Sequence, residues 1–255
     1  AASTTFADEP QTVAIDLSQL GTRHPGFRVD DAVTGGGSGY SVSGAGDVNG
    51  DGLTDIVIGS YESDQPSGRF ASDCHVVFGK ADGAPIELAS LGAAGFSIEG
   101  EPDTSSVGVS VSGAGDVNGD GLAHVLIGAG TTSAADRPGA GRTYVVFGKA
   151  DPGDVVLGSL GWNGFKIEGA RAFDASGLSV SGAGDVNGDG LDDILIGAYA
   201  ASPGGIRYAG VVVRRVRETN ERRRRPRGSR DGGVPDRGGR PGGLFRRQRL
   251  RRGRR

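Results

Sequence analysis

The sequence contains one cysteine and no methionine, and it has no long apolar run. A single cysteine, Cys74, excludes an intrachain disulfide and leaves the redox compartment open. No apolar stretch reaches the roughly 20 residues that a membrane-spanning helix needs, so we expect no transmembrane segment. The chain opens without a basic-then-apolar signal sequence. Since it also lacks an initiator methionine, we expect a processed product or a fragment.

Basic residues are scarce up to residue 213 and abundant after it. Residues 214–255 hold 18 Arg and four acids, whereas residues 1–213 hold the other 10 basic residues and 27 acids. The formal net charge of −3 therefore conceals a net of −17 followed by a net of +14. Such a change raises the question whether the two parts share one origin.

One ten-residue stretch, Gly-Ala-Gly-Asp-Val-Asn-Gly-Asp-Gly-Leu, occurs three times, at residues 44–53, 113–122 and 182–191. Successive copies lie 69 residues apart, and a constant period of this size indicates a repeat architecture. We divide the chain into five segments by this period. They are the end of a preceding unit at 1–26, full repeats at 27–95 and 96–164, a partial third repeat at 165–213, and an Arg-rich segment at 214–255.

Each repeat contains four short strand candidates, which in the second repeat lie at 96–99, 107–111, 123–127 and 142–147. They are β-branched or alternating, and Gly, Pro, Asp or Ser separates them. No helical period of useful length is present, which disfavours a helical solenoid. Four short strands with hairpin-length connections are typical of a propeller blade, and blades must stack to bury both faces. We predict an all-β chain of four-stranded antiparallel β-propeller blades, with about three intact blades and an incomplete ring.

The Arg-rich segment 214–255 does not continue the strand pattern, and as protein it predicts a disordered basic tail. The genetic code offers an explanation. Codons for residues 213–218, read one base later, can encode Tyr-Val-Val-Phe-Gly-Lys, the sequence at 144–149. Residues 234–238 and 245–254 match earlier repeats in the same shifted frame and register. We interpret the segment as an out-of-frame remnant of a fourth repeat rather than as a nucleic-acid arm, and expect no specific nucleic-acid partner.

The repeated stretch places side-chain oxygens at positions 1, 3, 5 and 9 and a backbone carbonyl of Leu at position 7. Glycines at positions 4 and 6 permit the tight turn that points these groups at one centre. A set of six to eight oxygens suits Ca²⁺, and Mg²⁺ is the second choice because it needs a stricter octahedron. The first copy supplies Asp47, Asn49, Asp51, Leu53 and Asp55, and the third supplies Asp185, Asn187, Asp189, Leu191 and Asp193.

The second copy departs from this pattern at position 9. Its ligand candidates are Asp116, Asn118, Asp120 and Leu122, but position 9 is His124. A histidine nitrogen is a poor ligand for Ca²⁺, so we expect weaker or absent binding there. All three copies lack the Glu at position 12 and the flanking helices of an EF-hand. A metal-free Asp/Asn/Gly turn is the alternative for any single loop, whereas three copies in register favour structural Ca²⁺ sites.

Other candidate site residues are weaker. The remaining histidines, His24 and His75, share no motif position with His124, and no Ser-His-Asp arrangement can be recognised from spacing. Cys74 lies in a strand candidate and is expected to be a small core residue. We expect Trp162 to pack between blades, and Gly35–Gly39 to be a flexible turn rather than a phosphate loop. No catalytic site is expected.

The repeated motif resembles the FG-GAP repeat, which builds the seven-bladed propellers of integrin α subunits and related bacterial secreted proteins. The resemblance covers residues 27–213 and rests on the Asp-x-Asn-x-Asp-Gly-x-x-Asp loop, the following Ile-Val-Ile-Gly or Ile-Leu-Ile-Gly strand and the closing Val-Val-Phe-Gly. The Phe-Gly element itself is blurred here, for example to Gly39-Tyr40, and the Gly-Ala-Pro element lacks its proline.

The resemblance implies calcium loops on one rim of the propeller and ligand binding on the other. It also implies a secreted or cell-surface protein that serves adhesion or protein–protein binding, with an extracellular protein or surface ligand as partner. Two alternatives remain open. In the first, the chain is an accessory propeller of a larger secreted hydrolase, as in glycosylphosphatidylinositol-specific phospholipase D. In the second, it is a purely structural repeat.

Overall fold

The computed structural model describes residues 17–21, 26–31, 37–60, 73–101, 104, 106–134, 136–206, 208 and 210–214. All of them lie in one compact unit, Ala1–Arg217. The remainder of the chain, Glu218–Arg255, is a second unit outside the described residues, so nearly all of the predicted remnant of a fourth repeat lies there. The described residues form β-strands and short 3-10 helices only, and none of these helices is long and apolar enough to cross a membrane.

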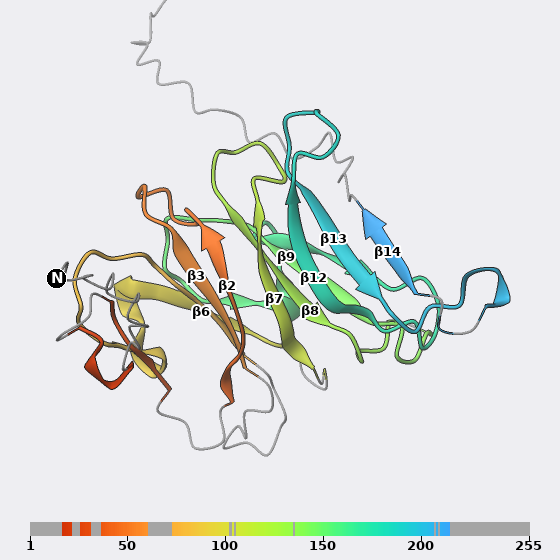
Figure 1. Ribbon diagram of the computed structural model, residues 1–255, viewed down its shortest axis with the longest axis horizontal. Helices are drawn as coiled ribbons and strands as arrows, with labels where there is room; N and C mark the ends of the chain where they lie inside the picture. Colours follow the sequence, from red (N-terminus) through yellow and green to blue (C-terminus); the bar gives the residue numbers. More distant parts are fainter. Residues whose placement is uncertain are drawn as a thin grey trace, which may run out of the picture. The chain divides into compact units, whose positions relative to one another are not determined.

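Most of the described strands belong to three sheets that repeat one antiparallel design (Figure 1), and β1 and β5 form a separate two-stranded parallel sheet. The first sheet contains β2 (Ser38–Gly46), β3 (Asp55–Ser60), β4 (Cys74–Val77) and β6 (Gly95–Glu99). The second contains β7 (Val107–Gly115), β8 (His124–Ala129), β9 (Arg142–Val146) and β11 (Gly164–Glu168). The third contains β12 (Ser176–Gly184), β13 (Asp193–Ala198) and β14 (Val211–Arg214). The prediction of an all-β chain built from propeller-type antiparallel blades is confirmed, and the described residues form no closed ring.

The blades are offset from the sequence repeats by one strand. The strand candidate at 96–99 opens the second repeat, but as β6 it pairs with β4 of the first sheet, with Phe96 opposite Val76. β11 likewise opens the third repeat and pairs with β9 of the second sheet. The connection between β4 and β6 contains β5, η2 and η3, and after it the chain returns antiparallel beside β4 and hydrogen-bonds to the older sheet. Each complete blade therefore takes its fourth strand from the next repeat.

In each of the first two repeats, a short segment pairs in parallel with the strand that opens the same repeat. β10 (Val155–Val156) pairs in parallel with β6, and η4 (Leu157–Ser159) follows it. β5 (Ile86–Glu87) pairs in the same way with β1 (Val29–Asp30), and η2 (Leu88–Ser90) and η3 (Gly92–Ala94) follow it. We call β5–η2 and β10–η4 the cover segments. The other 3-10 helices are η1 (Leu17–Gln19) and η5 (Pro203–Gly205).

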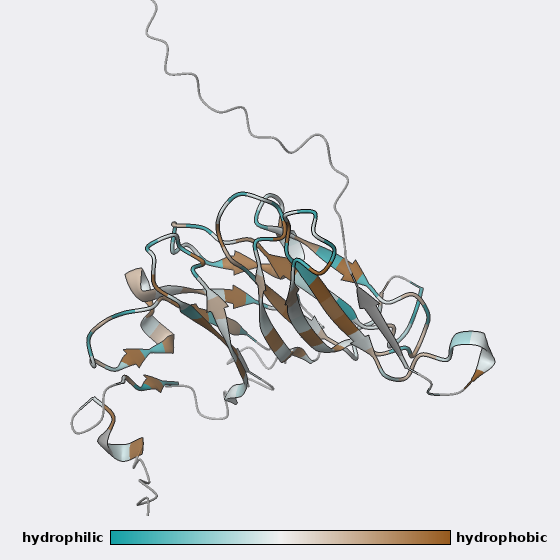
Figure 2. Cartoon of the chain, turned by 45° about the horizontal axis from the view of Figure 1, so that its top comes forward, coloured by the Kyte–Doolittle hydropathy of each residue, from teal (hydrophilic) through white to brown (hydrophobic). Residues whose placement is uncertain are grey.

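The core lies between neighbouring sheets, where apolar strand faces meet (Figure 2). Val57 and Val76 of the first sheet are in one cluster with Val111 and Tyr144 of the second. A second cluster joins the second and third sheets and contains Leu126, Val145, Val180 and Ile196. Burial of each such side chain stabilises the fold by roughly 1.5–3 kcal/mol, so stacking of the blades is the main source of stability.

Glycines permit strands of adjacent blades to approach closely (Figure 1). A Cβ on Gly113 would lie 2.7 Å from the carbonyl oxygen of Gly44. A Cβ on Gly128 would lie 2.0 Å from the carbonyl oxygen of Gly177, which is shorter than any non-bonded contact. Any side chain at these positions would force the blades apart.

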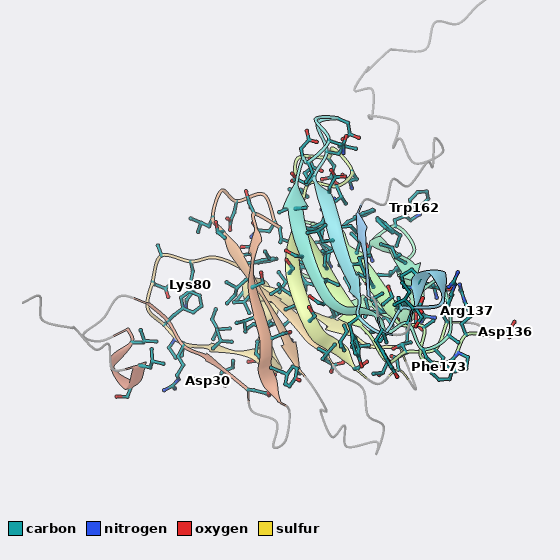
Figure 3. The ribbon with its side chains drawn as sticks, turned by 45° about the vertical axis from the view of Figure 1, so that its right-hand side comes forward. Asp30, Lys80, Asp136, Arg137, Trp162 and Phe173 are labelled. Atoms are coloured by element: carbon teal, nitrogen blue, oxygen red, sulfur yellow. The ribbon has the colours of Figure 1, made fainter. Side chains whose placement is uncertain are left out.

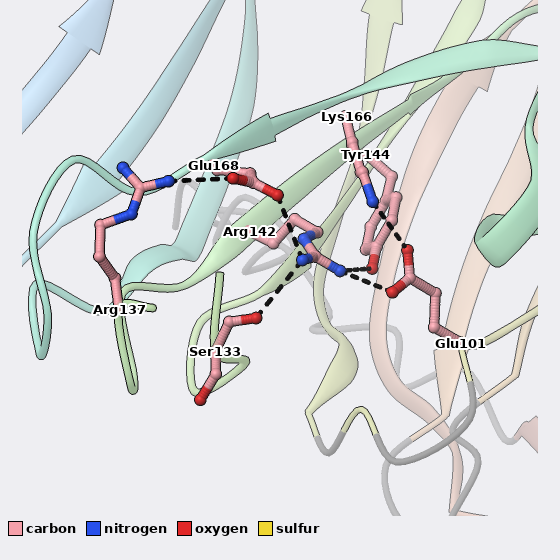
Figure 4. A network of polar contacts seen from close by, with 7 residues as sticks. All are labelled: Glu101, Ser133, Arg137, Arg142, Tyr144, Lys166 and Glu168. Carbon is pink, nitrogen blue, oxygen red and sulfur yellow. Dashed lines mark hydrogen bonds and ion pairs between the residues drawn. The ribbon is translucent and has the colours of Figure 1, made fainter. Parts of the chain in front are cut away.

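A buried polar network joins strands β9 and β11 at the end of the second sheet (Figure 4). Arg142 is 6% exposed, and its Nη1 lies 2.6 Å from Glu101 Oε2. Arg142 Nη1 donates to Tyr144 Oη at 3.2 Å, and Nη2 lies 3.3 Å from Glu168 Oε1. Arg137 Nη2 also contacts Glu168, at 3.0 Å. Burial is the main reason that the pKa of Tyr144 is raised to about 12, although Arg142 opposes it.

Two single residues show where core prediction succeeds and fails. Cys74 is fully buried in the first core cluster, as the sequence predicts. The prediction that Trp162 packs between blades is wrong, because Trp162 is 66% exposed (Figure 3). It belongs to the turn before β11, which carries the side chain to the outer rim rather than to a sheet face. His24, Gly35 and Gly36 lie outside the described residues, whereas Ser38 and Gly39 already belong to β2 rather than to a turn.

We expect Cys74 to react very slowly with thiol reagents in the folded protein. Burial raises the pKa of its thiol to about 12, which leaves a thiolate fraction on the order of 10⁻⁴ at pH 8, and the thiolate is the reactive form. Labelling with a chromogenic disulfide should be slow in buffer and complete within minutes in guanidinium chloride. Rapid labelling of the native protein would contradict this burial.

Candidate calcium loops

Each predicted calcium loop connects the first and second strands of one blade. The three loops follow β2, β7 and β12, and each begins at a register shift, as between Gly44 and Gly46. Gly46 has a φ of 78°, a left-handed conformation that glycine adopts without strain. Its counterparts Gly115 and Gly184 have φ values of 70° and 66°. The bulge turns the chain out of the sheet at the same place in every blade.

The first loop folds around the carboxylate of Asp47. Its Oδ1 accepts hydrogen bonds from the backbone N–H groups of Gly50 and Asp51, at 2.8 and 3.0 Å. Its Oδ2 accepts one from Gly52 at 2.9 Å. Asn49 Nδ2 donates to Asp51 Oδ2 at 2.9 Å, so the side chains at positions 3 and 5 also meet. The predicted ligand side chains at positions 1, 3 and 5 are thus gathered within one exposed turn.

The position-9 aspartates are buried and tie their loops to the sheet. Asp55 Oδ2 accepts a hydrogen bond from the Val48 N–H at 2.7 Å, and Oδ1 accepts one from the Gly79 N–H at 2.8 Å. Burial raises the pKa of the Asp55 carboxyl, and these backbone bonds oppose that rise. In the third loop Asp193 Oδ2 accepts from Asn187 Nδ2 at 2.7 Å, which joins positions 3 and 9. A buried carboxylate beside exposed ones provides the mixture of rigid and adaptable oxygens that Ca²⁺ accommodates.

The third loop repeats the design of the first around Asp185. Its carboxylate accepts backbone hydrogen bonds from Gly188, Asp189 and Gly190 at 2.8, 3.1 and 2.8 Å. These bonds, with the one from Gly190 foremost, lower the pKa of Asp185. Asp189 Oδ1 in turn accepts from the Leu191 N–H at 3.2 Å, as Asp51 does from Leu53 at 2.8 Å. The backbone N–H groups of the leucines at position 7 are therefore hydrogen-bonded within the loop.

The second loop has the same turn but a different anchor. Ligand atoms of Asp116, Asp120 and His124 lie within 4.8 Å of one another. His124 is fully buried, and burial lowers the pKa of its imidazole, which keeps the ring neutral. Its Nδ1 accepts a hydrogen bond from the Gly148 N–H at 3.1 Å, so the proton of the neutral ring is on Nε2. Neither nitrogen then offers a free lone pair to a cation, and His124 replaces the anchoring role of Asp55 without replacing its oxygens.

The loops are connected to one another across the blade boundaries. Asp192 Oδ2 accepts a hydrogen bond from the Asp116 N–H at 2.8 Å, and the Asp192 N–H donates to the Asp116 carbonyl at 3.0 Å. In the preceding pair the Ala123 N–H donates to the Asp47 carbonyl at 2.9 Å. In the sequence Asp192 is at position 8 of the third loop, where it adds one negative charge without being a predicted ligand. Its bridging role is visible only once adjacent blades are stacked.

His75 lies beside a serine of the neighbouring strand. It faces Ser97 as a cross-strand partner in β4 and β6, and His75 Nδ1 lies 3.3 Å from Ser97 Oγ. Burial lowers the pKa of His75. Directly opposed residues of two paired antiparallel strands commonly make such side-chain contacts.

Comparison with known proteins agrees with the repeats. The FG-GAP repeat family matches residues 38–71 and 176–213. The chain is 29% identical to integrin alpha-PS2 of Drosophila melanogaster over 172 residues, which are 64% of this chain and 11% of that protein. It is 29% identical to mouse integrin alpha-7 over 168 residues, covering 64% of this chain and 12% of the relative. It is 30% identical to integrin alpha pat-2 of Caenorhabditis elegans over 180 residues, covering 66% of this chain and 14% of the relative.

The chain contains FG-GAP repeats and is similar in sequence to integrin α chains, and its antiparallel sheets are consistent with β-propeller blades. It spans only about a tenth of the length of these curated relatives. The resemblance seen in the sequence is therefore confirmed for the repeat and the fold.

Proposed function

We propose that this chain is a calcium-stabilised, integrin-α-like propeller segment that serves adhesion or protein–protein binding outside the cell or at its surface. It acts without catalysis, and its partner is an extracellular protein or surface ligand. The observation that supports calcium most strongly is the coincidence of sequence and geometry in loops one and three. In both, the predicted ligand residues converge in one turn, and a buried position-9 aspartate anchors that turn to the sheet.

The donor set fits Ca²⁺ in the first and third loops. Each provides three carboxylates, one amide oxygen and a leucine backbone carbonyl, all hard oxygen donors. Three carboxylates in one short loop repel one another, and a divalent cation offsets that repulsion. When bound, the cation would supply charge neutralisation and a link between two strands. The second loop has only two carboxylates at ligand positions, and its position 9 is His124.

We expect two Ca²⁺ ions per chain by calorimetric titration, with a higher melting temperature in Ca²⁺ than in chelator. Saturation at a hundred times Kd stabilises the folded state by about 2.7 kcal/mol per site. Asp189→Ala, at an exposed ligand position, should reduce the stoichiometry to one. His124→Asp should raise it to three, because it restores a carboxylate at position 9. Asp151→Ala, which changes an exposed acid outside the loops, is the matched control and should leave two.

Equal melting midpoints with Ca²⁺ and with chelator would refute the calcium sites. The binding role is tested separately, by capture of extracellular matrix proteins on the immobilised chain with Ca²⁺ and with chelator. Adhesion predicts a bound protein that Asp189→Ala weakens and Asp151→Ala does not. Failure to retain any protein in Ca²⁺ would contradict the binding role while leaving the metal sites intact.

A further inference from the structure

Every asparagine in the described part of the chain precedes a glycine. Three of these Asn-Gly steps occupy positions 3 and 4 of the predicted calcium loops, and the fourth, Asn163-Gly164, leads into β11. Asparagine followed by glycine is the dipeptide most prone to lose its side-chain amide, because glycine leaves its own backbone nitrogen unhindered for attack on the asparagine Cγ. The loops therefore carry the sequence that this self-modification needs.

The three loops have the same sequence around the asparagine, so only the fold can distinguish them. Each copy reads Ser-Gly-Ala-Gly-Asp-Val-Asn-Gly-Asp-Gly-Leu, and the loops lie at the same end of their sheets (Figure 1). In all three, the N–H of the glycine at position 4 donates to Oδ1 of the aspartate at position 1, at 2.8, 2.7 and 2.8 Å in chain order. A carboxylate oxygen is thus in place to receive the proton that the glycine nitrogen must release.

In the first two loops the asparagine side chain folds over its own turn. Asn49 Oδ1 accepts a hydrogen bond from the Asp51 N–H at 2.9 Å, and Asn118 Oδ1 accepts one from the Asp120 N–H at 2.9 Å. The ring that each bond closes contains both the asparagine Cγ and the glycine nitrogen, so the two reacting atoms are held close together. The same N–H group stabilises the negative charge that develops on this oxygen when Cγ is attacked.

In the third loop the asparagine side chain is bonded to the sheet instead. Asn187 Nδ2 donates to Oδ2 of Asp193 at 2.7 Å, and Asp193 is only 4% exposed. The Asp189 N–H donates to Asp185 Oδ1, at 3.1 Å. Attack on Asn187 Cγ must first break a charge-assisted hydrogen bond to a buried carboxylate. In the first two loops the corresponding amide donates to the exposed aspartate at position 5.

We propose that Asn49 and Asn118 convert spontaneously into aspartate and isoaspartate, through a cyclic imide formed with the glycine that follows each of them. The Gly50 nitrogen forms a bond to Asn49 Cγ while its proton passes to the Asp47 carboxylate. The bond between Cγ and Nδ2 then breaks, and the proton goes to the leaving nitrogen, which departs as ammonia. Water opens the imide at one carbonyl to give aspartate, or at the other to give isoaspartate. The second loop follows the same steps with Asp116 as the base.

The conversion adds one negative charge to each of these two loops. In the second loop, a carboxylate in place of the Asn118 amide is the third one, beside those of Asp116 and Asp120 at positions 1 and 5. Isoaspartate also adds one carbon atom to the backbone of the turn. The inference concerns the calcium-free loops and is independent of the proposed function, because neither the base nor the reacting atoms require a bound cation.

Peptide mapping by mass spectrometry tests the proposal site by site, because Lys and Arg residues place Asn49, Asn118 and Asn187 in different tryptic peptides. The folded chain is incubated at neutral pH in excess chelator, and isoaspartate is quantified with an isoaspartyl methyltransferase. Asn49 and Asn118 should convert at least tenfold faster than Asn187. In guanidinium chloride the three rates should agree, since the local sequences are identical. Equal rates in the folded chain, or a difference that persists in guanidinium chloride, would overturn the proposal.

The variant Asp47→Asn tests the base. Its amide oxygen can still accept the hydrogen bond from the Gly50 N–H but cannot take up the proton, so conversion of Asn49 should slow at least tenfold. Conversion of Asn118 in the same chain should not change. Asp51→Ala is the matched control, because it removes the same charge from the loop but keeps the backbone N–H that donates to Asn49, and it should not slow the reaction. Unchanged or faster conversion of Asn49 in Asp47→Asn, or equal slowing in both variants, would overturn the proposal.

Discussion

Arg142→Ala should destabilise the folded chain by about 3–5 kcal/mol, the usual cost of breaking a buried ion pair from one side. Arg142 is the cation between Glu101 and Glu168, and it also donates to Tyr144 (Figure 4). Its removal leaves Glu101, whose side chain is only 17% exposed, with Lys166 at 3.5 Å as its ion-pair partner among the described residues. Urea unfolding followed by circular dichroism measures the change in the free energy of unfolding.

Arg137→Ala is the matched control for Arg142. Its side chain is 38% exposed and contacts the same Glu168, so its loss should cost less than about 1 kcal/mol, as for surface ion pairs. Arg142→Met should cost less than Arg142→Ala, because the longer apolar chain fills part of the vacated space. If both arginine-to-alanine variants unfold at the same urea concentration, the network does not stabilise the second blade.

Asp55→Ala should destabilise the calcium-free protein by about 2–4 kcal/mol. The substitution leaves the backbone N–H groups of Val48 and Gly79 without acceptors, and each buried unsatisfied donor costs roughly 1–3 kcal/mol. Asp55→Asn should also be costly, because its amide NH₂ would face one of these donors. Thermal and urea unfolding should be measured in excess chelator, so that loss of Asp55 is not confused with loss of bound metal.

The variant Asp51→Ala distinguishes the anchoring role of Asp55 from the effect of removing one negative charge from the loop. Asp51 is exposed and bonds only within its own turn in the described contacts, so its substitution should cost less than about 1 kcal/mol in chelator. In the second blade a histidine takes the place of the anchoring aspartate. There His124 retains the bond to the Gly148 N–H, which corresponds to the bond between Asp55 and Gly79. Equal destabilisation by Asp51→Ala and Asp55→Ala would show that burial of Asp55 does not stabilise the first blade.

Local patterns made the strands and loops predictable from the sequence. The spacing of 69 residues defines the repeats, and β-branched runs such as Ile194–Ile196 lie in strands of the structure. The convergence of Asp47, Asn49 and Asp51 also follows from local geometry, because Gly50 and Gly52 adopt φ values of 80° and 88°. Whether these loops bind Ca²⁺ stays a prediction.

Contacts between repeats were not predictable in the same way. The bridge from Asp192 to Asp116 spans 76 residues, and Asp192 has no acidic counterpart in the other loops, where the same position is Ala123 or Thr54. Arg142 has no equivalent in the other blades, where the same position is Asp73 or Val211, so a search for repeated residues cannot find its network. The period alone also cannot show where one sheet ends and the next begins, since a repeated pattern has no natural starting point.

The borrowing of the fourth strand from the next repeat determines the order in which the blades can be completed during synthesis. The first sheet lacks β6 until the chain has been made to Glu99, and β6 remains uncovered until Val155 and Leu157 have followed. A ribosome that has finished one 69-residue unit has therefore finished no blade. The edge of each sheet therefore stays unpaired until the first strand of the next repeat has been synthesised.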